Sequence, residues 1–308
     1  MPPLLRRALV RLLEIIPVLW VVITLTFVMA RWVPGGPFDT ERQLTPEAKA
    51  HNMEYYGLDQ PLYVQYMKYL WNFAHGDLGS LYRHPDWTVN ELLAKKASVS
   101  AELGMWASLV ALVVGLLAGV IAAARPRSKT DYTTMTLAMV AICLPSFVLG
   151  PLLLLIFGLH LQWVGVMGWN SASDRVLPSL VLGLYYAAYI ARLTRGSMLE
   201  VRNQDYIRTA QAKGSPPRRV LFVHALRNAL GPVVAYLAPT VAGLVTGSFV
   251  VESIFQIPGI GRMFVEAALN QEYELLLGVT VLFSAILLLC NWVGDLLITF
   301  LNPKAAID

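Results

Sequence analysis

The stretch of sequence that decides the fold is VSAELGMWASLVALVVGLLAGVIAAA, residues 99–124, in which Glu102 is the only charged residue. A helix that crosses the hydrocarbon core of a bilayer needs about 20 mostly apolar residues, because its backbone polar groups find no water there. Residues 99–124 meet this condition in length and in composition. The stretch therefore predicts a membrane-spanning helix in an all-α membrane protein.

Five further segments have the same apolar character, so that the 308-residue chain contains six predicted spans. Pro145 and Pro151 interrupt the third span, and Arg192 ends the fourth, which is the shortest. The five segments are Leu9–Ala30, Tyr132–Gly158, Val176–Ala191, Ala229–Val251 and Leu275–Leu301.

The composition of the whole chain agrees with burial in a membrane. Hydrophobic residues make up 56% of it and charged residues 14%, whereas soluble chains carry about 25% charged residues. These values exclude a soluble enzyme, a disordered chain and a nucleic-acid-binding module. Cys143 and Cys290 each lie in an apolar run, so they form neither a disulfide framework nor a metal site of familiar spacing.

The first span has some features of a signal peptide, because Arg6, Arg7 and Arg11 form a basic N-terminal region. Its apolar run is longer than the roughly 7–15 residues of a signal sequence. We therefore expect a retained membrane anchor.

The positions of the basic residues predict the orientation. With the N-terminus in the cytoplasm, 15 of the 24 Lys and Arg residues fall on the cytoplasmic side, Lys304 among them. Because loops on that side are enriched in Lys and Arg, both termini are expected in the cytoplasm. The predicted divisions are an N-terminal segment with the first span (1–30), an extracytoplasmic helical domain (31–97) and a core transmembrane domain (98–308) that contains a cytoplasmic segment (192–228).

The segment 31–97 contains the start and stop signals of several helices. These signals are N-capping residues, prolines at helix starts and glycines at helix ends. The expected boundaries are an N-cap at Thr45 before Pro46, ends at Gly57 and Gly76, a start at Pro61 and a capping box formed by Thr88 and Glu91.

Apolar and aromatic residues of the second of these helices share one helical face. Such a stripe either binds a partner, or else packs on the membrane-spanning helices or rests at the membrane interface, which is the commoner case. The stripe consists of Leu62, Tyr66, Tyr69, Leu70 and Phe73.

The segment 192–228 is heavily basic and predicts two short helices joined by a glycine bend. The first contains Tyr206 to Lys213, Gly214 is a natural helix stop, and the second runs into the fifth span. Ala210 and Ala212 give the first helix little side-chain bulk, so it can press into a groove of another protein. A basic loop held against anionic lipid headgroups accounts for the charge equally well.

The last predicted outside loop, Glu252 to Glu274, contains the turn Pro258-Gly259-Ile260-Gly261. A periodic apolar run follows the turn and predicts a short helix that lies in the membrane face or re-enters it. The residues of this run are Met263, Phe264, Ala267 and Ala268.

Sequence patterns of several catalytic and ion-coupling sites are missing. The dipeptide Gly-Lys of a phosphate-binding loop does not occur, and the histidines show no metal-ligand spacing. Glu14, Glu102 and Asp295 lie near span ends, where we expect interfacial or helix-packing roles rather than a proton relay. The chain is therefore expected to be a non-catalytic protein that binds no cofactor or metal.

Several stretches together resemble one family, the permease subunits of binding-protein-dependent ABC importers, in its peptide branch and its B-type oligopeptide form. The resemblance covers nearly the whole chain. The matching stretches are Pro34–Phe38, His75–Gly79, Arg195–Met198, Tyr206–Ala210, Ala212–Gly214, His224–Ala229, Pro258–Gly261 and Asn270–Tyr273. The general importer pattern begins with Glu, where this chain has Arg208, a replacement that is usual in the peptide branch.

The resemblance implies a type I importer fold with a coupling helix that docks on a cytoplasmic ATPase. Two such ATPase subunits would bind ATP and Mg, a homologous C-type permease would complete a heterodimer, and an extracytoplasmic binding protein would deliver the peptide. The location implied is the bacterial inner membrane. The residues implied in coupling to the ATPase are Tyr206, Ile207, Arg208, Thr209, Ala210, Ala212, Lys213 and Gly214.

The same resemblance places the substrate path between the two permeases, along spans two to five. Small polar groups and helix distortion mark four candidate lining residues, although ordinary helix packing explains them equally well. The four are Pro145, Ser146, Thr246 and Ser248.

Other functions remain open at this point. Within the family, the cargo could be oligopeptides, which we favour, or dipeptides, nickel, heme or opines. A stand-alone secondary transporter would need intramembrane ion-coupling groups and an internal repeat, and an intramembrane enzyme would need a catalytic dyad; neither pattern is evident.

Overall fold

A computed structural model describes residues 3–38, 45–82 and 86–301, although the side chains of 3–9, 218 and 297–301 are not considered. Within these ranges the chain is helical, with one isolated bridge between Ser80 and Thr88 and no strand. The all-α prediction is therefore confirmed. Lys304 lies outside the described residues.

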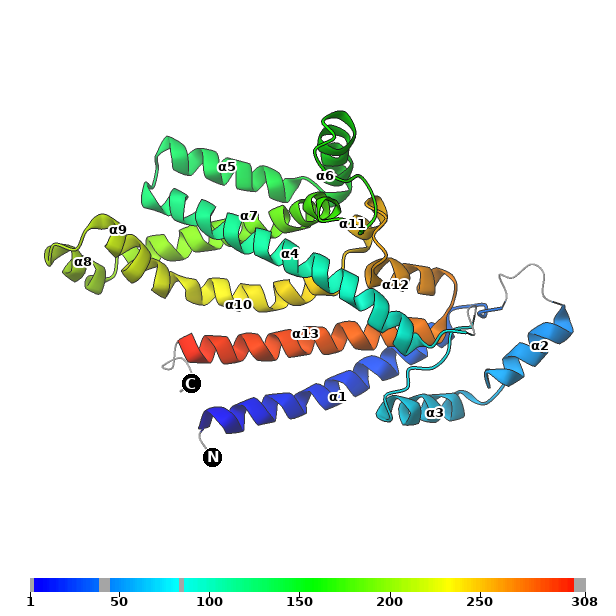
Figure 1. The fold of residues 1–308 in the computed structure, drawn as a ribbon. Coiled ribbons are helices and arrows are strands. Elements are labelled where there is room, and N and C mark those ends of the chain that lie inside the picture. Colours follow the sequence, from blue (N-terminus) through cyan, green and yellow to red (C-terminus); the bar gives the residue numbers. More distant parts are fainter. Residues whose placement is uncertain (1–2, 39–44, 83–85, 302–308) are drawn as a thin grey trace. The chain divides into compact units, whose positions relative to one another are not determined.

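Long helices form the candidate spans (Figure 1). Five are long and apolar enough to cross a membrane, and a bent pair of helices makes up to six. The helices concerned are α1 (Pro3–Trp32), α4 (Val89–Ala124), α5 (Lys129–Cys143) with α6 (Ser146–Leu153), α7 (Val176–Arg202), α10 (Leu226–Val245) and α13 (Tyr273–Leu301). Irregular turns extend some of them, at Leu154–His160, Ser173–Arg175 and Val220–Ala225.

Short helices connect or precede these spans. They are α2 (Pro46–Tyr55), α3 (Leu62–Ala74), α8 (Asp205–Ala212), α9 (Pro217–Arg219), α11 (Phe249–Ile254) and α12 (Ile260–Leu269). The last of them is the short apolar helix expected after the turn at 258–261, so that prediction is confirmed.

The third predicted span is broken rather than straight, because α5 and α6 meet at 104°. Pro145 disfavours helical backbone at the residue before it, and Leu144 is extended, with φ −81° and ψ 113°. Pro151 lies inside α6 without ending it. The break at Pro145 therefore turns the chain, whereas Pro151 is accommodated.

The helix of the fourth span continues beyond the predicted end of the apolar stretch. We expected it to end before Arg192, but α7 continues to Arg202. Arg195 in this extension binds the carboxylate of Asp131, so a charged residue at the end of the apolar stretch is compensated without a helix break.

The chain divides into two compact units, one of Met1–Ser98 with Gly259–Ile286 and the other of Val99–Pro258 with Leu287–Asp308. In the first unit, Thr45 accepts a hydrogen bond from the Ala48 N–H at 3.2 Å, as an N-cap does. Thr88 and Glu91 exchange the two hydrogen bonds of a capping box, at 3.1 and 3.2 Å. The expected helix starts are therefore confirmed.

The aromatic stripe of α3 packs on membrane-spanning helices of the same unit. Tyr69 forms a buried cluster with Phe27 of α1 and Leu277 of α13, and the Tyr66 hydroxyl lies 2.6 Å from that of Thr24. The packing alternative is thus confirmed for these residues. Leu62, at the start of the stripe, is 58% exposed. That residues 31–97 fold as a separate domain remains a prediction.

In the second unit, the backbones of α4 and α7 lie close together. A Cβ atom at Gly115 would approach the Ala187 carbonyl oxygen at 2.7 Å, and one at Gly119 would approach that of Ala191 at the same distance. Gly183 faces Ala107 in the same way. Small residues permit such close approach between membrane helices, and Figure 1 shows α5 and α10 also running beside α7.

Candidate functional site

The connection between α7 and α10 contains the residues predicted to couple to a partner. The first helix of this connection, α8, ends at Ala212, and Gly214 has a φ of +75°, a left-handed conformation that favours glycine. Gly214 N–H donates to the Gln211 carbonyl at 2.9 Å, and Ser215 N–H donates to that of Ala210 at 3.1 Å. These bonds occupy carbonyls that the helix end would otherwise leave free, so the predicted glycine bend is present.

One side chain holds α8 against the rest of its unit. Ile207 is fully buried and lies in a cluster with Met198 of α7 and Val220 and Ala225 of the turn before α10. Asn228 of α10 also donates a hydrogen bond to the Tyr206 hydroxyl at 2.8 Å. These contacts join α8 to α7 and to the start of α10.

The opposite face of α8 is open. Ala210 is half-buried, and Ile207 faces inward, so these two contribute less to an external surface than the sequence suggested. The exposed members of the predicted set are Tyr206, Arg208, Thr209, Ala212, Lys213 and Gly214. We call these six residues the α8 surface.

The α8 surface carries an available positive charge. The Arg208 side chain is 72% exposed, and its NH1 atom lies 3.9 Å from the Asp205 carboxylate, which is itself 99% exposed. An ion pair this exposed and this long contributes little stability. Arg208 is consequently free to exchange this contact for an acidic group on a partner.

A buried ion pair braces α5 against α7. Asp131 accepts hydrogen bonds from Arg195 at two oxygens, from Nε at 2.6 Å and from NH2 at 2.8 Å, and a third from the Arg127 N–H at 2.9 Å. We did not single out Asp131 from the sequence. A charged residue next to a predicted span was the available signal, but its partner 64 positions away was not evident.

Glu102 has the helix-packing role predicted for it. Its carboxylate accepts hydrogen bonds from Arg175 Nε at 2.6 Å and from Trp169 Nε1 at 2.8 Å. A second carboxylate, Glu252 of α11, is fully buried and accepts a hydrogen bond from Ser100 Oγ at 2.8 Å. Glu252 was not recognised as a buried group from the sequence, because it directly follows the predicted fifth span and was assigned to the outside loop.

The four predicted path residues have local structural roles. Pro145 is the N-cap of α6, directly before Ser146, and its carbonyl accepts from the Val148 N–H at 2.9 Å. Thr246 donates to the Gly243 carbonyl at 3.0 Å, and Ser248 accepts weakly from the Val251 N–H at 3.4 Å. Ser146, Thr246 and Ser248 are half-buried and Pro145 is exposed, so a lining role stays a prediction.

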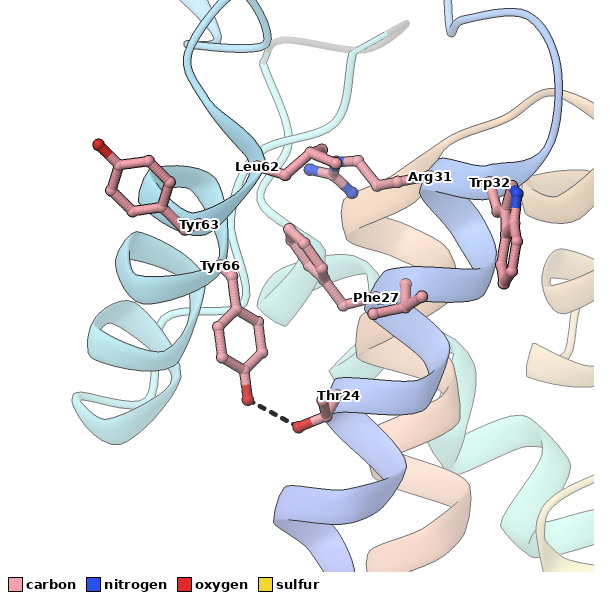
Figure 2. A pocket seen from close by; sticks show the side chains of 8 residues that line it. Thr24, Phe27, Arg31, Trp32, Leu62, Tyr63 and Tyr66 are labelled. Carbon is pink, nitrogen blue, oxygen red and sulfur yellow. Dashed lines mark hydrogen bonds between the residues drawn. The ribbon is translucent and has the colours of Figure 1, made fainter.

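A cavity of about 520 Å³ lies between α1 and α3 (Figure 2). Figure 2 shows Phe27 and Arg31 of α1 on one side and Leu62 and Tyr66 of α3 on the other. The walls are mostly hydrocarbon and aromatic ring, and no member of the α8 surface or of the predicted path lines it.

Arg31 lines this cavity and has partners for part of its guanidinium, whereas its NH1 atom is buried without a hydrogen-bond partner among the described residues. Its side chain is 9% exposed, its Nε donates to Gln65 at 2.9 Å, and Glu274 lies 3.8 Å away. The guanidinium also lies over the ring of Phe27, at 4.3 Å from the centroid. Near Glu274, burial raises the pKa of the Tyr82 hydroxyl well above its usual value. These groups stabilise the first unit.

The apolar helices that are long enough to cross a membrane, with the short, exposed helix α8 between the fourth and the fifth, define an integral membrane protein. Residues 115–307 match the family described as binding-protein-dependent transport system inner membrane component. The chain belongs to this family, and the expectation from its sequence motifs is confirmed.

The curated relatives cover almost the whole chain. The oligopeptide transport system permease protein OppB of Salmonella typhimurium is 46% identical over 296 residues, 96% of this chain and 97% of the relative. The OppB of Haemophilus influenzae is 44% identical over the same shares. The dipeptide transport system permease protein DppB of Bacillus subtilis is 45% identical over 92% of each chain.

The fold is that of a type I ABC importer permease. A chain of the MetNI methionine ABC transporter, in an inward-facing conformation, superposes with a TM-score of 0.56 at 19% identity. The superposition covers 68% of this chain and 96% of that one. The protein with the present sequence is thus a transport component of the inner membrane.

Proposed function

We propose that this chain is the permease subunit of an ATP-driven importer that passes oligopeptides from an extracytoplasmic binding protein into the cytoplasm. The observation that carries the proposal is the 46% identity to an oligopeptide permease over 96% of the chain. Resemblance of this extent includes both the spans and the connecting segments, rather than the common fold alone.

In this proposal the chain works within a larger assembly. A homologous C-type permease completes the membrane path as a heterodimer, and two cytoplasmic ATPase subunits bind ATP and Mg. Both termini and the segment 192–228 lie in the cytoplasm, and residues 31–97 face the binding protein. The segregation of Lys and Arg on one side of the spans supports this orientation.

The α8 surface is the docking site for an ATPase subunit. Its small residues allow a groove to approach the helix backbone, while Arg208 and Lys213 supply polar contacts at the rim. Ile207 and Tyr206 tie α8 to α7 and α10. Closure of the ATPase dimer on ATP would therefore move these spans and switch the path from inward-facing to outward-facing.

The second candidate function is that of a dipeptide permease, which differs from the first only in its cargo. The 45% identity to the Bacillus subtilis dipeptide permease favours it almost as strongly. Nickel, heme and opines are further cargoes that the family resemblance allows. Because the binding protein selects the cargo in such importers, the permease sequence alone separates these candidates weakly.

A reconstitution experiment tests the proposal. The chain is co-expressed with its neighbouring genes, purified through a tag and placed in proteoliposomes with binding protein, ATP and labelled peptides of two to six residues. We expect an ATPase and a second permease to co-purify, and uptake to be greatest for peptides longer than two residues. Transport by the chain alone would establish a secondary transporter instead, and preferential dipeptide uptake would establish the second candidate.

A further inference from the structure

A cluster of tyrosines on α7 and α10 lies outside all the residues discussed so far. Tyr185, Tyr186 and Tyr189 belong to α7, and Tyr236 belongs to α10. The rings of Tyr185 and Tyr189 are 5.3 Å apart between centroids, and those of Tyr189 and Tyr236 stack at 6.1 Å with 29° between their planes. We call Tyr185, Tyr189 and Tyr236 the tyrosine face.

The tyrosine face lies at the middle of the membrane-spanning part of α7. Arg175 and Arg195 bracket this part, and Tyr185 is ten positions from each of them. At about 1.5 Å per residue, Tyr185 is about 15 Å from either arginine. Since the hydrocarbon core is about 30 Å thick, Tyr185 lies near the midplane.

Tyrosines are unusual at this depth. They normally occupy the interfaces, where the ring is buried and the hydroxyl meets water. A hydroxyl transferred from water to hydrocarbon without a partner costs about 4–8 kcal/mol. Tyr185 is nevertheless 38% exposed, and Tyr189 and Tyr236 are half-buried. The hydroxyls of Tyr185 and Tyr189 are hydrogen-bonded to each other, and a polar, exposed group of three tyrosines at this depth favours contact with water or with another protein rather than with lipid.

A positively charged residue on the same face of α7 favours contact of this face with water. Arg192 lies seven positions after Tyr185 and three after Tyr189, so it continues the same helical face. Its guanidinium is 5.7 Å from the centroid of the Tyr189 ring, and the residue is exposed. Arg192 directly follows the predicted fourth span, so it makes this end of the helical face polar and accessible to water.

Two rings of the cluster pack on their inner side against buried residues. Tyr186 and Tyr236 pack against the buried residues Ala111, Ile190 and Val233. Tyr185 in turn contacts the ring of Tyr186, and Tyr189 contacts that of Tyr236, so each ring of the tyrosine face packs on a supported neighbour or is supported itself.

We propose that the tyrosine face lines the water-filled route and hydrogen-bonds the main chain of a peptide in transit. This inference rests on the proposed function. A tyrosine hydroxyl both donates and accepts, and so can pair with the C=O and N–H groups that every peptide has. The neutral rings tolerate varied side chains, and Arg192 is complementary to the C-terminal carboxylate of a peptide.

The first test removes the three hydroxyls and keeps the rings, as Tyr185→Phe, Tyr189→Phe and Tyr236→Phe together, in the whole reconstituted complex. We expect uptake of a labelled pentapeptide to fall at least about five-fold, with the second permease and ATPase still co-purifying. Tyr132→Phe, which removes an exposed tyrosine of α5, is the matched control and should leave uptake unchanged.

The outcomes of this test distinguish failure of the inference from failure of the proposed function. Unchanged uptake by the triple variant would overturn the inference and leave the proposed function intact. Loss of the second permease on purification would show that the tyrosine face is a dry subunit interface, and would also overturn it. A wild-type complex that imports no peptide would instead overturn the proposed function.

The second test measures water access directly. Tyr185→Cys, in a chain with Cys143→Ala and Cys290→Ala, is treated with a charged methanethiosulfonate reagent. We expect rapid labelling that slows when binding protein, peptide and ATP are added. Leu25→Cys on α1, at a position that is 58% exposed and has apolar residues three and four positions away on either side along the helix, should react only with a lipid-soluble maleimide. The same lipid-only reactivity at position 185 would contradict the inference.

Discussion

Asp131 and Arg195 form a two-point ion pair that joins the start of α5 to α7, with Oδ1 2.6 Å from Nε and Oδ2 2.8 Å from NH2. The Asp131 side chain is 3% exposed and that of Arg195 is 30% exposed. The pair lies on the stretch of α7 that leads to α8. It therefore braces α7 against α5 near the end of α7 that leads to α8.

Asp131→Asn should destabilise the protein, because it leaves the Arg195 guanidinium without its counter-charge. We expect a loss of about 1–3 kcal/mol, measured as a lower apparent Tm in detergent. In a double-mutant cycle with Arg195→Gln, the coupling energy should account for most of this loss. The exposed pair Arg262–Glu266 is the control, and its coupling should stay below about 0.5 kcal/mol. Equal coupling in the two pairs would contradict this prediction.

Ile207→Ala should loosen α8, because it removes the buried side chain that anchors this helix. Large-to-small changes at such sites cost about 2–5 kcal/mol, although a short surface helix can yield locally instead of unfolding the whole protein. We expect faster hydrogen exchange confined to residues 203–216 and reduced capture of the ATPase. Ile207→Val should have a much smaller effect. Exchange unchanged in Ile207→Ala would show that α8 is held by other contacts.

Gly214→Val should disturb the end of α8 for a conformational reason. A Cβ atom at this position would meet nothing within 4 Å, so space is available, but the φ of +75° is unfavourable for a β-branched residue. The expected cost is about 1–2 kcal/mol, with weaker association of the ATPase in a pull-down. Gly214→Asn should be tolerated, since Asn visits this conformation. If the Asn and Val variants behave alike, the conformational explanation fails.

Ala212→Trp should block docking without unfolding the chain, because Ala212 is exposed at the end of α8. We expect unchanged thermal stability together with loss of ATPase co-purification and of peptide-stimulated ATP hydrolysis. Tyr132→Trp, which places a tryptophan at an exposed position of α5, should leave both unchanged. If the ATPase still associates with the Ala212→Trp variant, the α8 surface is not the docking site.

Ser146→Asp tests the predicted path at the bend between α5 and α6. If Ser146 lines a water-filled route, a carboxylate there should leave assembly intact and lower uptake of acidic peptides more than that of basic ones. The measurement is uptake of a matched pair of labelled peptides by the reconstituted complex. Equal uptake of both by an intact complex would exclude a lining role for this residue.

The sequence by itself determined the features that depend on a few neighbouring residues. Apolar runs predicted the spans, Thr45 and the Thr88–Glu91 pair predicted helix starts, and Gly214 predicted the bend after α8. Caps, glycine stops and hydropathy act over one or two helical turns, so the information lies within the segment itself. The family resemblance likewise came from short motifs that follow one another along the chain.

Only the tertiary structure decided which distant groups meet. The sequence contained Asp131 and Arg195, but no local pattern pairs them across 64 positions, and none turns Ile207 inward while Tyr206 faces outward. The tyrosine face depends in the same way on Tyr236 of α10 stacking on Tyr189 of α7. Such contacts depend on the packing of whole helices, where close approach at glycines and the burial of apolar faces choose the neighbours.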